Sequence, residues 1–401
     1  MRNMVKHWHT IRLGDACVTN ASPYSPKEVW TFVNYLDTGN ITENRIDSIQ
    51  HIDLAKEELP SRAKRKVKKN SIIYSTVRPN QRHYGIIKTI PQNFLVSTGF
   101  AVIDADSQLL DADFLYYVLT QATVVDKLHA IAAQSTSAYP SLRPSDIENL
   151  EIDIPTLDEQ RAIASILRCI DEKIRLNTQI NQNLEQQAQA IFKSWFVETA
   201  NPHWRVGTIA DLGEVVGGST PSKAHSEYYT EHGIAWITPK DLSVDKSKFI
   251  SHGEIDITQA GLKNSSAKVM PKGTVLFSSR APIGYIAIAA GEVCTNQGFK
   301  SVVPHVHIAT PYVYFFLKEN LPSIEGVATG STFKEVSASA MKSVSATIPD
   351  SDTLNRFTEL CVPLFEAQEK LEAESRRLAT LRDTLLPKLM SGEIDVSEVE
   401  V

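Results

Sequence analysis

Few residues of this chain have the types and spacing that catalysis requires. Asp171 and Lys173 show a carboxylate–x–lysine spacing found in some nucleases, but they fall inside a predicted helix, where such surface charges are common. His305 and His307 would face the same way along a strand, yet no third metal ligand lies near them. Phosphate-loop, dinucleotide-binding, zinc-protease and nucleophile-elbow motifs are absent, as is the Asn/Asp-Pro-Pro-aromatic motif of amino-methyltransferases. We therefore predict no catalytic residue and no metal site in this chain.

The distribution of charge is more informative. The 401 residues carry a net charge of −6, but residues 56–88 hold ten Lys and Arg against Glu57 and Glu58 alone. Residues 350–401 hold 6 basic and 12 acidic side chains, which accounts for the whole net charge. Basic charge is therefore concentrated in one segment, as it would be for an anionic partner or a solvated charged face.

The composition predicts a cytoplasmic protein without membrane contact. No apolar run reaches 18 residues, and residues 1–11 show no cleavable signal. Widely spaced cysteines without a Cys-x-x-Cys pair indicate neither zinc nor disulfides, but buried thiols in a reducing compartment. They are Cys17, Cys169, Cys294 and Cys361.

Two long helices are predicted to position the rest of the chain. Residues 156–198 place apolar side chains three and four positions apart, and Thr156 with Glu159 forms a capping box at the start. At ~1.5 Å per residue, this helix would be roughly 60 Å long. Residues 351–385 show heptad spacing, so we expect the two helices to pack as a coiled coil. The simpler alternative is that each helix covers only the core of its own domain.

Three features of this helix pair can be tested. Asn177 and Asn181 lie near the seam of the first helix, where a polar residue can fix the register. Pro363 should kink or break the second helix early, because proline removes a helical donor. The predicted apolar seam of the second helix consists of Phe357, Leu360, Leu364, Ala367, Leu371, Leu378, Leu381 and Leu385, with Glu374 as its one polar member.

The chain repeats itself at an offset of about 194–203 residues. Strand-like segments, aromatic helices and an Ile-Pro pair before each long helix all recur, which indicates two copies of one α+β domain. The matching segments include 70–76 with 273–279, 98–100 with 297–299, 115–119 with 313–317, and 154–155 with 348–349.

Two divergent domains, each followed by a long helix, resemble the specificity subunit of Type I restriction-modification enzymes. The resemblance covers the whole chain and is most specific at 154–161 (IPTLDEQR), 190–196 (AIFKSWF) and 381–394 (LRDTLLPKLMSGEI). The second copy departs from the Pro-x-x-x-Glu-Gln pattern, since Thr353-Leu354 stands where Glu-Gln would.

The resemblance implies a division of labour. Two target-recognition domains would each read one half of a split, asymmetric DNA site, and antiparallel helices would join and separate them. Two methyltransferase subunits would dock along the helices, and restriction subunits could join. S-adenosylmethionine, ATP and Mg²⁺ would be bound by these partners, and the target adenine would be flipped into a partner's pocket.

Several residues suit contact with double-stranded DNA. Clustered cations release counterions from phosphates, and this role fits Lys64, Arg65, Lys66, Lys68 and Lys69. Arginine pairs with guanine, and Asn or Gln pairs with adenine. Base contact is therefore expected from the loop residues Arg78, Asn80, Gln81 and Arg82 in the first copy, and Ser278, Ser279 and Arg280 in the second. Polar residues beside the repeated Gly-Phe are candidates for base contact or for a structural loop role: Ser97, Thr98, Thr295, Asn296 and Gln297.

We therefore expect an α+β chain with two similar target-recognition domains and two long helices packed as an antiparallel coiled coil. Two other functions stay open, a coiled-coil scaffold that never touches DNA and a stand-alone bipartite DNA-binding protein. The predicted segments are residues 1–153 (copy 1), 154–200, 201–347 (copy 2), 348–391 and an acidic tail at 392–401.

Overall fold

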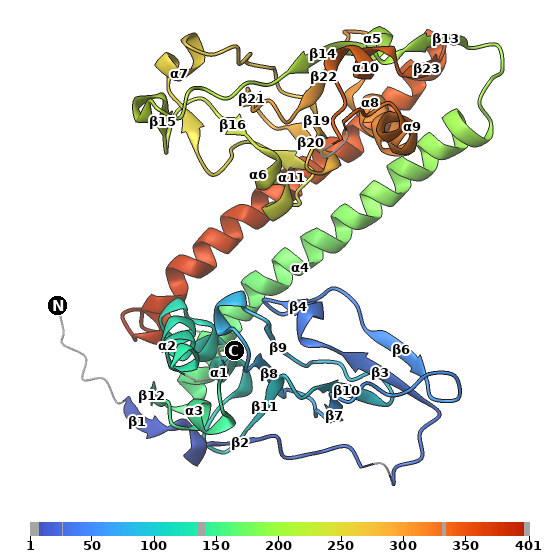
Figure 1. Ribbon diagram of the computed structural model, residues 1–401. Coiled ribbons are helices and arrows are strands. Elements are labelled where there is room, and N and C mark those ends of the chain that lie inside the picture. Colours follow the sequence, from blue (N-terminus) through green and yellow to red (C-terminus); the bar gives the residue numbers. More distant parts are fainter. Residues whose placement is uncertain (1–7, 26, 135–140, 331–333, 397–401) are drawn as a thin grey trace. The chain divides into compact units, whose positions relative to one another are not determined.

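The computed structural model describes residues 8–25, 27–134, 141–330 and 334–396. Its internal contacts divide the chain into two compact units, Met1–Glu172 with Leu378–Val401, and Lys173–Arg377. Each unit contains one copy and a part of both long helices, α4 (Leu157–Lys193) and α11 (Ser351–Met390) (Figure 1). The mixed fold is as predicted. Residues 1–7 of copy 1 and 397–401 of the acidic tail lie outside the described residues, and the predicted segment limits stay predictions.

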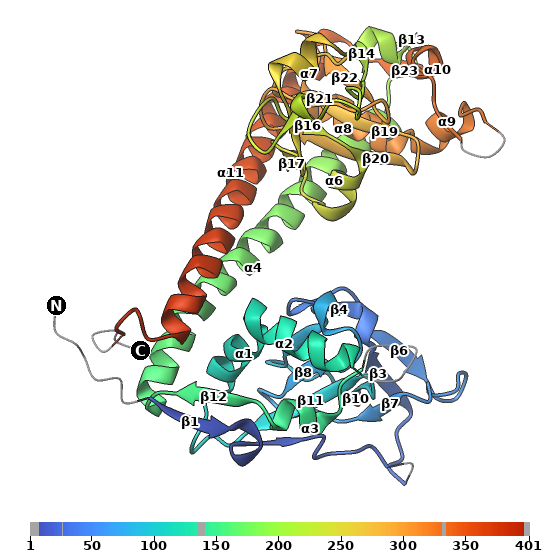
Figure 2. The ribbon, with the colours of Figure 1, turned by 60° about the vertical axis from the view of Figure 1, so that its left-hand side comes forward.

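Copy 1 is built around a four-stranded antiparallel sheet in the order β2-β11-β8-β9. Side chains alternate across this sheet. Ile72 and Tyr74 belong to a core that also contains residues of the helices, whereas Ile73 belongs to a second core. Figure 2 shows α1 and α2 beside the strands of this sheet. The strands are β2 (Cys17–Thr19), β8 (Ile72–Ser75), β9 (Tyr84–Ile86) and β11 (Phe100–Ala105), and the helices are α1 (Ala112–Thr120), α2 (Ala122–Ala133) and α3 (Pro144–Glu148).

Copy 2 repeats this sheet and adds a strand, in the order β14-β22-β19-β20-β17. The alternation is the same, because Val275 and Phe277 face the helical core and Leu276 faces the other core. The strands are β14 (Gly213–Gly217), β17 (Phe249–Ile250), β19 (Val275–Ser279), β20 (Ile283–Ala289) and β22 (Lys300–Pro304). The helices are α5 (Ile209–Leu212), α6 (Pro239–Val244), α7 (Gln259–Lys263), α8 (Thr310–Glu319), α9 (Leu321–Gly326) and α10 (Ala338–Ser343).

A short antiparallel ladder closes each copy before its long helix begins. In copy 1, β1 (His9–Arg12) pairs with β12 (Glu151–Ile154). In copy 2, β13 (Arg205–Thr208) pairs with β23 (Ser345–Ile348). The start of each domain is thereby bound to the strand that leads into α4 or α11.

The second sheets of the two copies differ. Copy 1 has four strands in the order β6-β3-β10-β7, and copy 2 has two separate strand pairs, β15-β18 and β16-β21. One pair is common to both, because β3-β10 and β16-β21 are parallel. The strands are β3 (Phe32–Leu36), β6 (Gln50–Asp53), β7 (Ala63–Arg65), β10 (Phe94–Ser97), β15 (Tyr229–Thr230), β16 (Trp236–Ile237), β18 (Asp256–Ile257) and β21 (Cys294–Thr295). A two-residue hairpin arm, β4 (Ile41–Thr42) with β5 (Arg45–Ile46), completes copy 1.

The two long helices run antiparallel within each unit. In the second unit, the Asn177 amide donates to Glu374, and the Asn181 amide donates to the carbonyl of Gln368, so residue numbers rise along one helix as they fall along the other. Asn177 is fully buried, which confirms its predicted place at the seam. Beyond Lys193, α4 continues as a π-helical turn, Ser194–Glu198.

Two expectations for α11 are wrong. Pro363 does not break the helix, which runs unbroken through it from Ser351 to Met390 with the proline on the exposed side. The buried stripe is also displaced from the predicted heptads, since Leu360 and Leu381 are 49% and 47% exposed. The helix packs against the core of copy 2 as well as against α4, and that core selects a stripe that shares Phe357 with the predicted seam but otherwise differs from it: Leu354, Phe357, Cys361, Phe365 and Gln368.

Candidate nucleic-acid interface

The basic segment 64–69 includes the end of β7, an edge strand of the second sheet in copy 1. Lys64 and Lys69 are exposed. Lys66 is half-buried, with Nζ 2.9 Å from Glu28, and Lys68 is exposed although its Nζ lies 3.6 Å from Asp104. Three lysines of this segment are therefore exposed, and two of its lysines have a carboxylate partner, Lys68 being in both groups.

Arg65 behaves differently from its neighbours. Its side chain is half-buried, and burial lowers the pKa of the guanidinium. One terminal nitrogen, Nη1, is buried without a protein partner. Arginine is far from deprotonation at neutral pH, so Arg65 adds a positive charge close beneath the surface.

The β8–β9 loop presents a cluster of exposed polar side chains. Arg78 and Arg82 have positive φ values of 48° and 57°, which are uncommon for residues with a side chain. Buried Pro79 anchors a 3₁₀ turn between them, and this turn contacts α2. Asn80 and Gln81 are exposed at the tip. Arg82 donates to Glu43 at 2.7 Å, and this hydrogen bond raises the pKa of Arg82.

The equivalent β19–β20 loop in copy 2 is shorter, and two of its predicted contacts are corrected. Ser278 and Ser279 are fully buried. The Ser278 hydroxyl donates to Pro282 O, and the Ser279 hydroxyl donates to Gly298 O. These serines therefore hold the loop and are withdrawn as base contacts. Arg280 is half-buried and lies 3.3 Å from Glu335.

The residues beside the repeated Gly-Phe divide in the same way. Ser97 is buried and accepts a hydrogen bond from Gly99 N, and Thr295 is also buried. Both are withdrawn as base contacts, because base edges cannot reach a closed core. Thr98 is half-buried, and half-buried Asn296 accepts from Gly298 N, so it supports the turn. Gln297 is exposed and bonds the Thr220 hydroxyl.

In copy 1, backbone hydrogen bonds connect the three predicted groups. Thr98 N donates to Arg62 O, which links the Gly-Phe turn to the residue two positions before the basic segment. Thr76 N donates to Gly99 O, which links the same turn to the β8–β9 loop. One continuous stretch of copy 1 therefore joins the exposed lysines to Arg78. Arg62 is exposed within it and is a further candidate for phosphate contact, which its position outside the dense basic run had hidden in the sequence.

In copy 2 one carboxylate connects the β19–β20 loop with the strand that follows the Gly-Phe turn. Glu335 binds Arg280 through Oε2 and Lys300 Nζ through Oε1, at 3.3 and 3.1 Å. Lys300 follows the Gly-Phe turn, so Glu335 connects that turn to the loop. No signal in the sequence pointed to Lys300 or Glu335, because they are 35 residues apart.

The other chemical candidates have structural roles. Asp171 accepts hydrogen bonds from Tyr117 and Arg382 at 2.7 and 2.9 Å, so it joins α4 to copy 1 and to α11. The rings of His305 and His307 stack at 6.0 Å. Within the described residues no group of three His, Cys, Asp or Glu side chains could hold a metal ion. No helix in that part of the chain is long and apolar enough to cross a membrane.

Comparison with known proteins gives the family. The model of the Type I restriction modification DNA specificity domain matches twice, at residues 5–186 and 201–364. The HindI specificity subunit of Haemophilus influenzae is 26% identical over 465 aligned positions, which cover 96% of this chain and 99% of that protein. The MjaIX specificity subunit of Methanocaldococcus jannaschii is 41% identical over 163 residues, 40% of this chain and 38% of that protein.

A solved structure has the same fold. The S subunit of a Type I restriction-modification system from M. genitalium has a TM-score of 0.60 at 18% identity, over 97% of each chain. The two family matches together cover most of this chain, once for each copy that the strand order defines. The chain therefore belongs to the specificity subunits of Type I restriction-modification systems, whose repeated domain recognises DNA.

Proposed function

We propose that this chain recognises a two-part asymmetric DNA site, with copy 1 reading one half and copy 2 the other. One observation carries the proposal. The central sheets, closing ladders and long helices are equivalent in the two copies, whereas the second sheets and the loops beside them differ. Two domains with the same central sheet and different surface loops can each read a different DNA sequence, because contacts to base edges specify sequence.

Catalysis is assigned to partner chains. We propose that two methyltransferase subunits and the restriction subunits assemble with this chain, and that they bind S-adenosylmethionine, ATP and Mg²⁺. The absence of catalytic motifs from the sequence supports this division. The target adenine would be flipped out of the duplex into a methyltransferase pocket, because the reacting atom is inaccessible within the stack.

The decisive experiment compares methylated adenines, mapped on single DNA molecules, in cells with and without this gene. A motif of two defined parts and an undefined gap should disappear when the gene is removed. The isolated chain should bind DNA weakly or be poorly soluble, and co-expression with its methyltransferase should rescue it. Tight, specific binding by the chain alone would favour a stand-alone binder, and no DNA binding in any complex would favour a scaffold.

A further inference from the structure

Strand β17 ends the central sheet of copy 2, and α11 completes it. On one side β17 pairs in parallel with β20, with Phe249 opposite Ile288. On the other side Glu372 of α11 accepts from the amides of Lys248 and Phe249, both at 3.0 Å. Arg376 donates to Phe249 O at 3.3 Å. Helix side chains thus satisfy the backbone groups that a further strand would bind.

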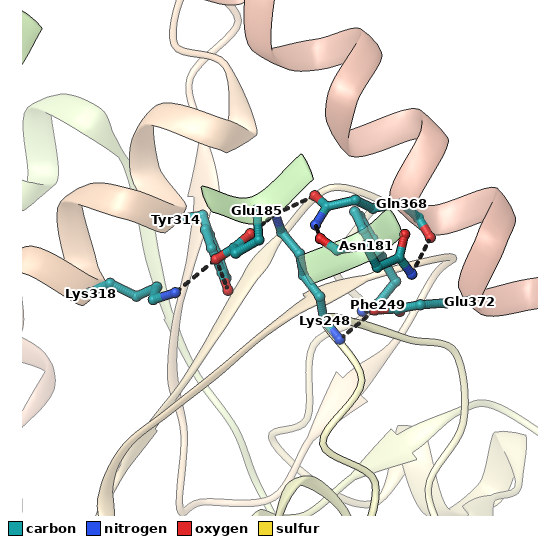
Figure 3. A network of polar contacts seen from close by, with 8 residues as sticks. All are labelled: Asn181, Glu185, Lys248, Phe249, Tyr314, Lys318, Gln368 and Glu372. Carbon is teal, nitrogen blue, oxygen red and sulfur yellow. Dashed lines mark hydrogen bonds and ion pairs between the residues drawn. The ribbon is translucent and has the colours of Figure 1, made fainter. Parts of the chain in front are cut away.

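Lys248, directly before β17, reaches into the space between the two long helices (Figure 3). Its side chain is only 7% exposed, and Nζ lies 2.7 Å from Glu185 of α4. The same nitrogen donates to Gln368 of α11 at 2.8 Å. It lies 3.1 Å from the ring centroid of Phe365 and 4.5 Å from that of Tyr314, within cation–π distance of both. One ammonium group therefore contacts both helices and α8.

The partners of Lys248 are themselves fixed. Glu185 also accepts from Lys318 and Tyr314 of α8, at 2.7 and 3.2 Å. Gln368 donates from its amide to Asn181 O at 3.0 Å. A buried charge is tolerated only when it is paired and its polar neighbours are satisfied, and a side chain held by such a network has one position. We call the following residues the Lys248 network: Asn181, Glu185, Lys248, Tyr314, Lys318, Gln368 and Glu372.

Copy 1 is attached to the helices in a different way, through Asp171 of α4, which binds Tyr117 of α1 and Arg382 of α11. Its central sheet ends at β9, and the edge is covered from within the copy. Ile86 N donates to the side chain of Asn44, and Asn44 N donates to Tyr84 O, at 2.9 and 2.8 Å. The sheet edge of copy 1 is thus closed by its own hairpin arm, and that of copy 2 by α11.

We propose that Lys248 is the positioning residue of copy 2, which locks the central sheet to α4 and α11 and so fixes where this copy reads DNA along the helices. The inference rests on the proposed two-part recognition. Loss of the lock should leave both half-site sequences unchanged, because no base-contact candidate is altered. It should instead allow gap lengths other than that of the wild-type motif.

The test uses the complex of the full chain with its methyltransferase, in which wild type is compared with Lys248→Met. Methionine keeps the length and the apolar contacts but removes the charge. We expect hydrogen exchange of residues 246–250 to accelerate at least tenfold and methylation of the wild-type motif to fall several-fold. Sites with the same two halves and a gap altered by one base pair should become methylated. Lys248→Arg, which can keep the pair with Glu185, should restore the original gap.

Two further variants make the result unambiguous. Lys240→Met removes an exposed ion pair with Glu254 in the same copy, outside the Lys248 network, and should change nothing. Glu372→Gln leaves the Lys248 side-chain contacts intact but weakens the hydrogen bonds to the amides of β17. It should therefore allow altered gap lengths to a smaller extent than Lys248→Met does. If Lys248→Met unfolds copy 2, Glu372→Gln still tests the inference. Unchanged exchange and a single wild-type gap in both network variants would overturn the inference. A wild-type complex without any two-part motif would instead overturn the proposed function, and the exchange rates would still test the lock.

Discussion

The two copies share a frame but differ at the sheet edges and in the charge beside them. Equivalent strands β8 and β19 lie in equivalent sheets, yet the segment before β8 has five cations within six residues, and the segment before β19 has Lys268 and Lys272. Lys272 is engaged with Glu369 of α11 at 2.7 Å. Lys272 of copy 2 therefore binds α11, whereas Lys64 and Lys69 of copy 1 are exposed.

The largest effect is expected from changing the helices that both copies share. Inserting four residues near Gln186-Gln187 of α4 alone would displace Ala188 and Phe192, which lie just beyond and belong to the core of copy 2. Matched insertions between 172 and 173 and between 377 and 378 keep both units intact. Inserting two residues in each helix rotates the remainder of that helix by about 200° and should abolish methylation.

Four residues in each helix give the milder result. They add about 6 Å with nearly one full turn, and a base-pair step is ~3.4 Å. The gap in the methylated motif should lengthen by one or two base pairs while both half-sites stay the same. Methylation mapping checks this directly. An unchanged gap at full activity would mean that the helices serve as a docking platform and set no distance.

The next effect tests the charge difference between the copies. Lys64→Gln with Lys69→Gln should weaken DNA binding of the complex for all sequences and reduce the slope of log affinity against log salt by about 1.8, since each phosphate contact contributes about 0.9. Adding Arg65, Lys66 and Lys68 to the change should add less than three further contacts, because Lys66 and Lys68 already have carboxylate partners. Lys342→Gln with Lys370→Gln, two exposed lysines of the second unit, is the charge-matched control. An equal slope change in the control would return segment 64–69 to a solvated face.

A smaller effect distinguishes the two loops. Arg78→Ala should cost about 1–3 kcal/mol at one base pair of the first half-site, if Arg78 binds guanine through two hydrogen bonds. Arg280→Ala should cost less at one base pair of the second half-site, because Arg280 must leave Glu335 to reach DNA. Affinities for single-base variants of the site measure both. A uniform loss at all positions would reassign the arginine to phosphate.

The last effect is on stability and concerns how each copy is attached to the helices. Burial lowers the pKa of Lys248 from 10.5 to about 8. Between these values the unfolded chain binds the proton more readily than the folded chain, so the contribution of Lys248 to stability rises with pH. The stability difference between wild type and Lys248→Met should widen by about 1–3 kcal/mol from about pH 7.5 to about pH 10.

Copy 1 provides the control for this titration. Burial acts to lower the pKa of Arg382, but hydrogen bonds and charge from Asp171 outweigh it and raise the pKa. Arginine therefore stays charged across the same window. The stability difference for Arg382→Met should be constant, as measured by denaturant unfolding at both pH values. The account would be contradicted if the stability difference from wild type widened with pH for Arg382→Met, or if it did not widen for Lys248→Met.

The sequence predicted the repeat, the two helices and the family, because periodicity and landmark spacing are local properties. It did not predict which face of α11 is buried, since the core of copy 2 decides that. It also placed Ser97, Ser278, Ser279 and Thr295 at the interface, although hydroxyls beside a tight turn serve the backbone equally well. Burial is a tertiary property, and no short motif encodes it.

The starts of the two long helices show the same limit. Buried Gln160 accepts from Asp111 N and donates to Leu109 O and Pro155 O, so the Glu-Gln pattern ties α4 to copy 1. At the departure from this pattern in copy 2, Leu354 is buried in the core, and Asp350 caps α11 through Thr353 N. The motif was visible in the sequence, but the substitute contact was not.

One measurement tests the central claim, that each copy reads its own half of the site. Residues 1–153 are replaced by the equivalent domain of a relative with a different known motif, and methylated adenines are mapped in cells. Because contacts far apart usually act independently, one half of the motif should take the relative's sequence while the other half is unchanged. A change in both halves, or in neither, would contradict the account.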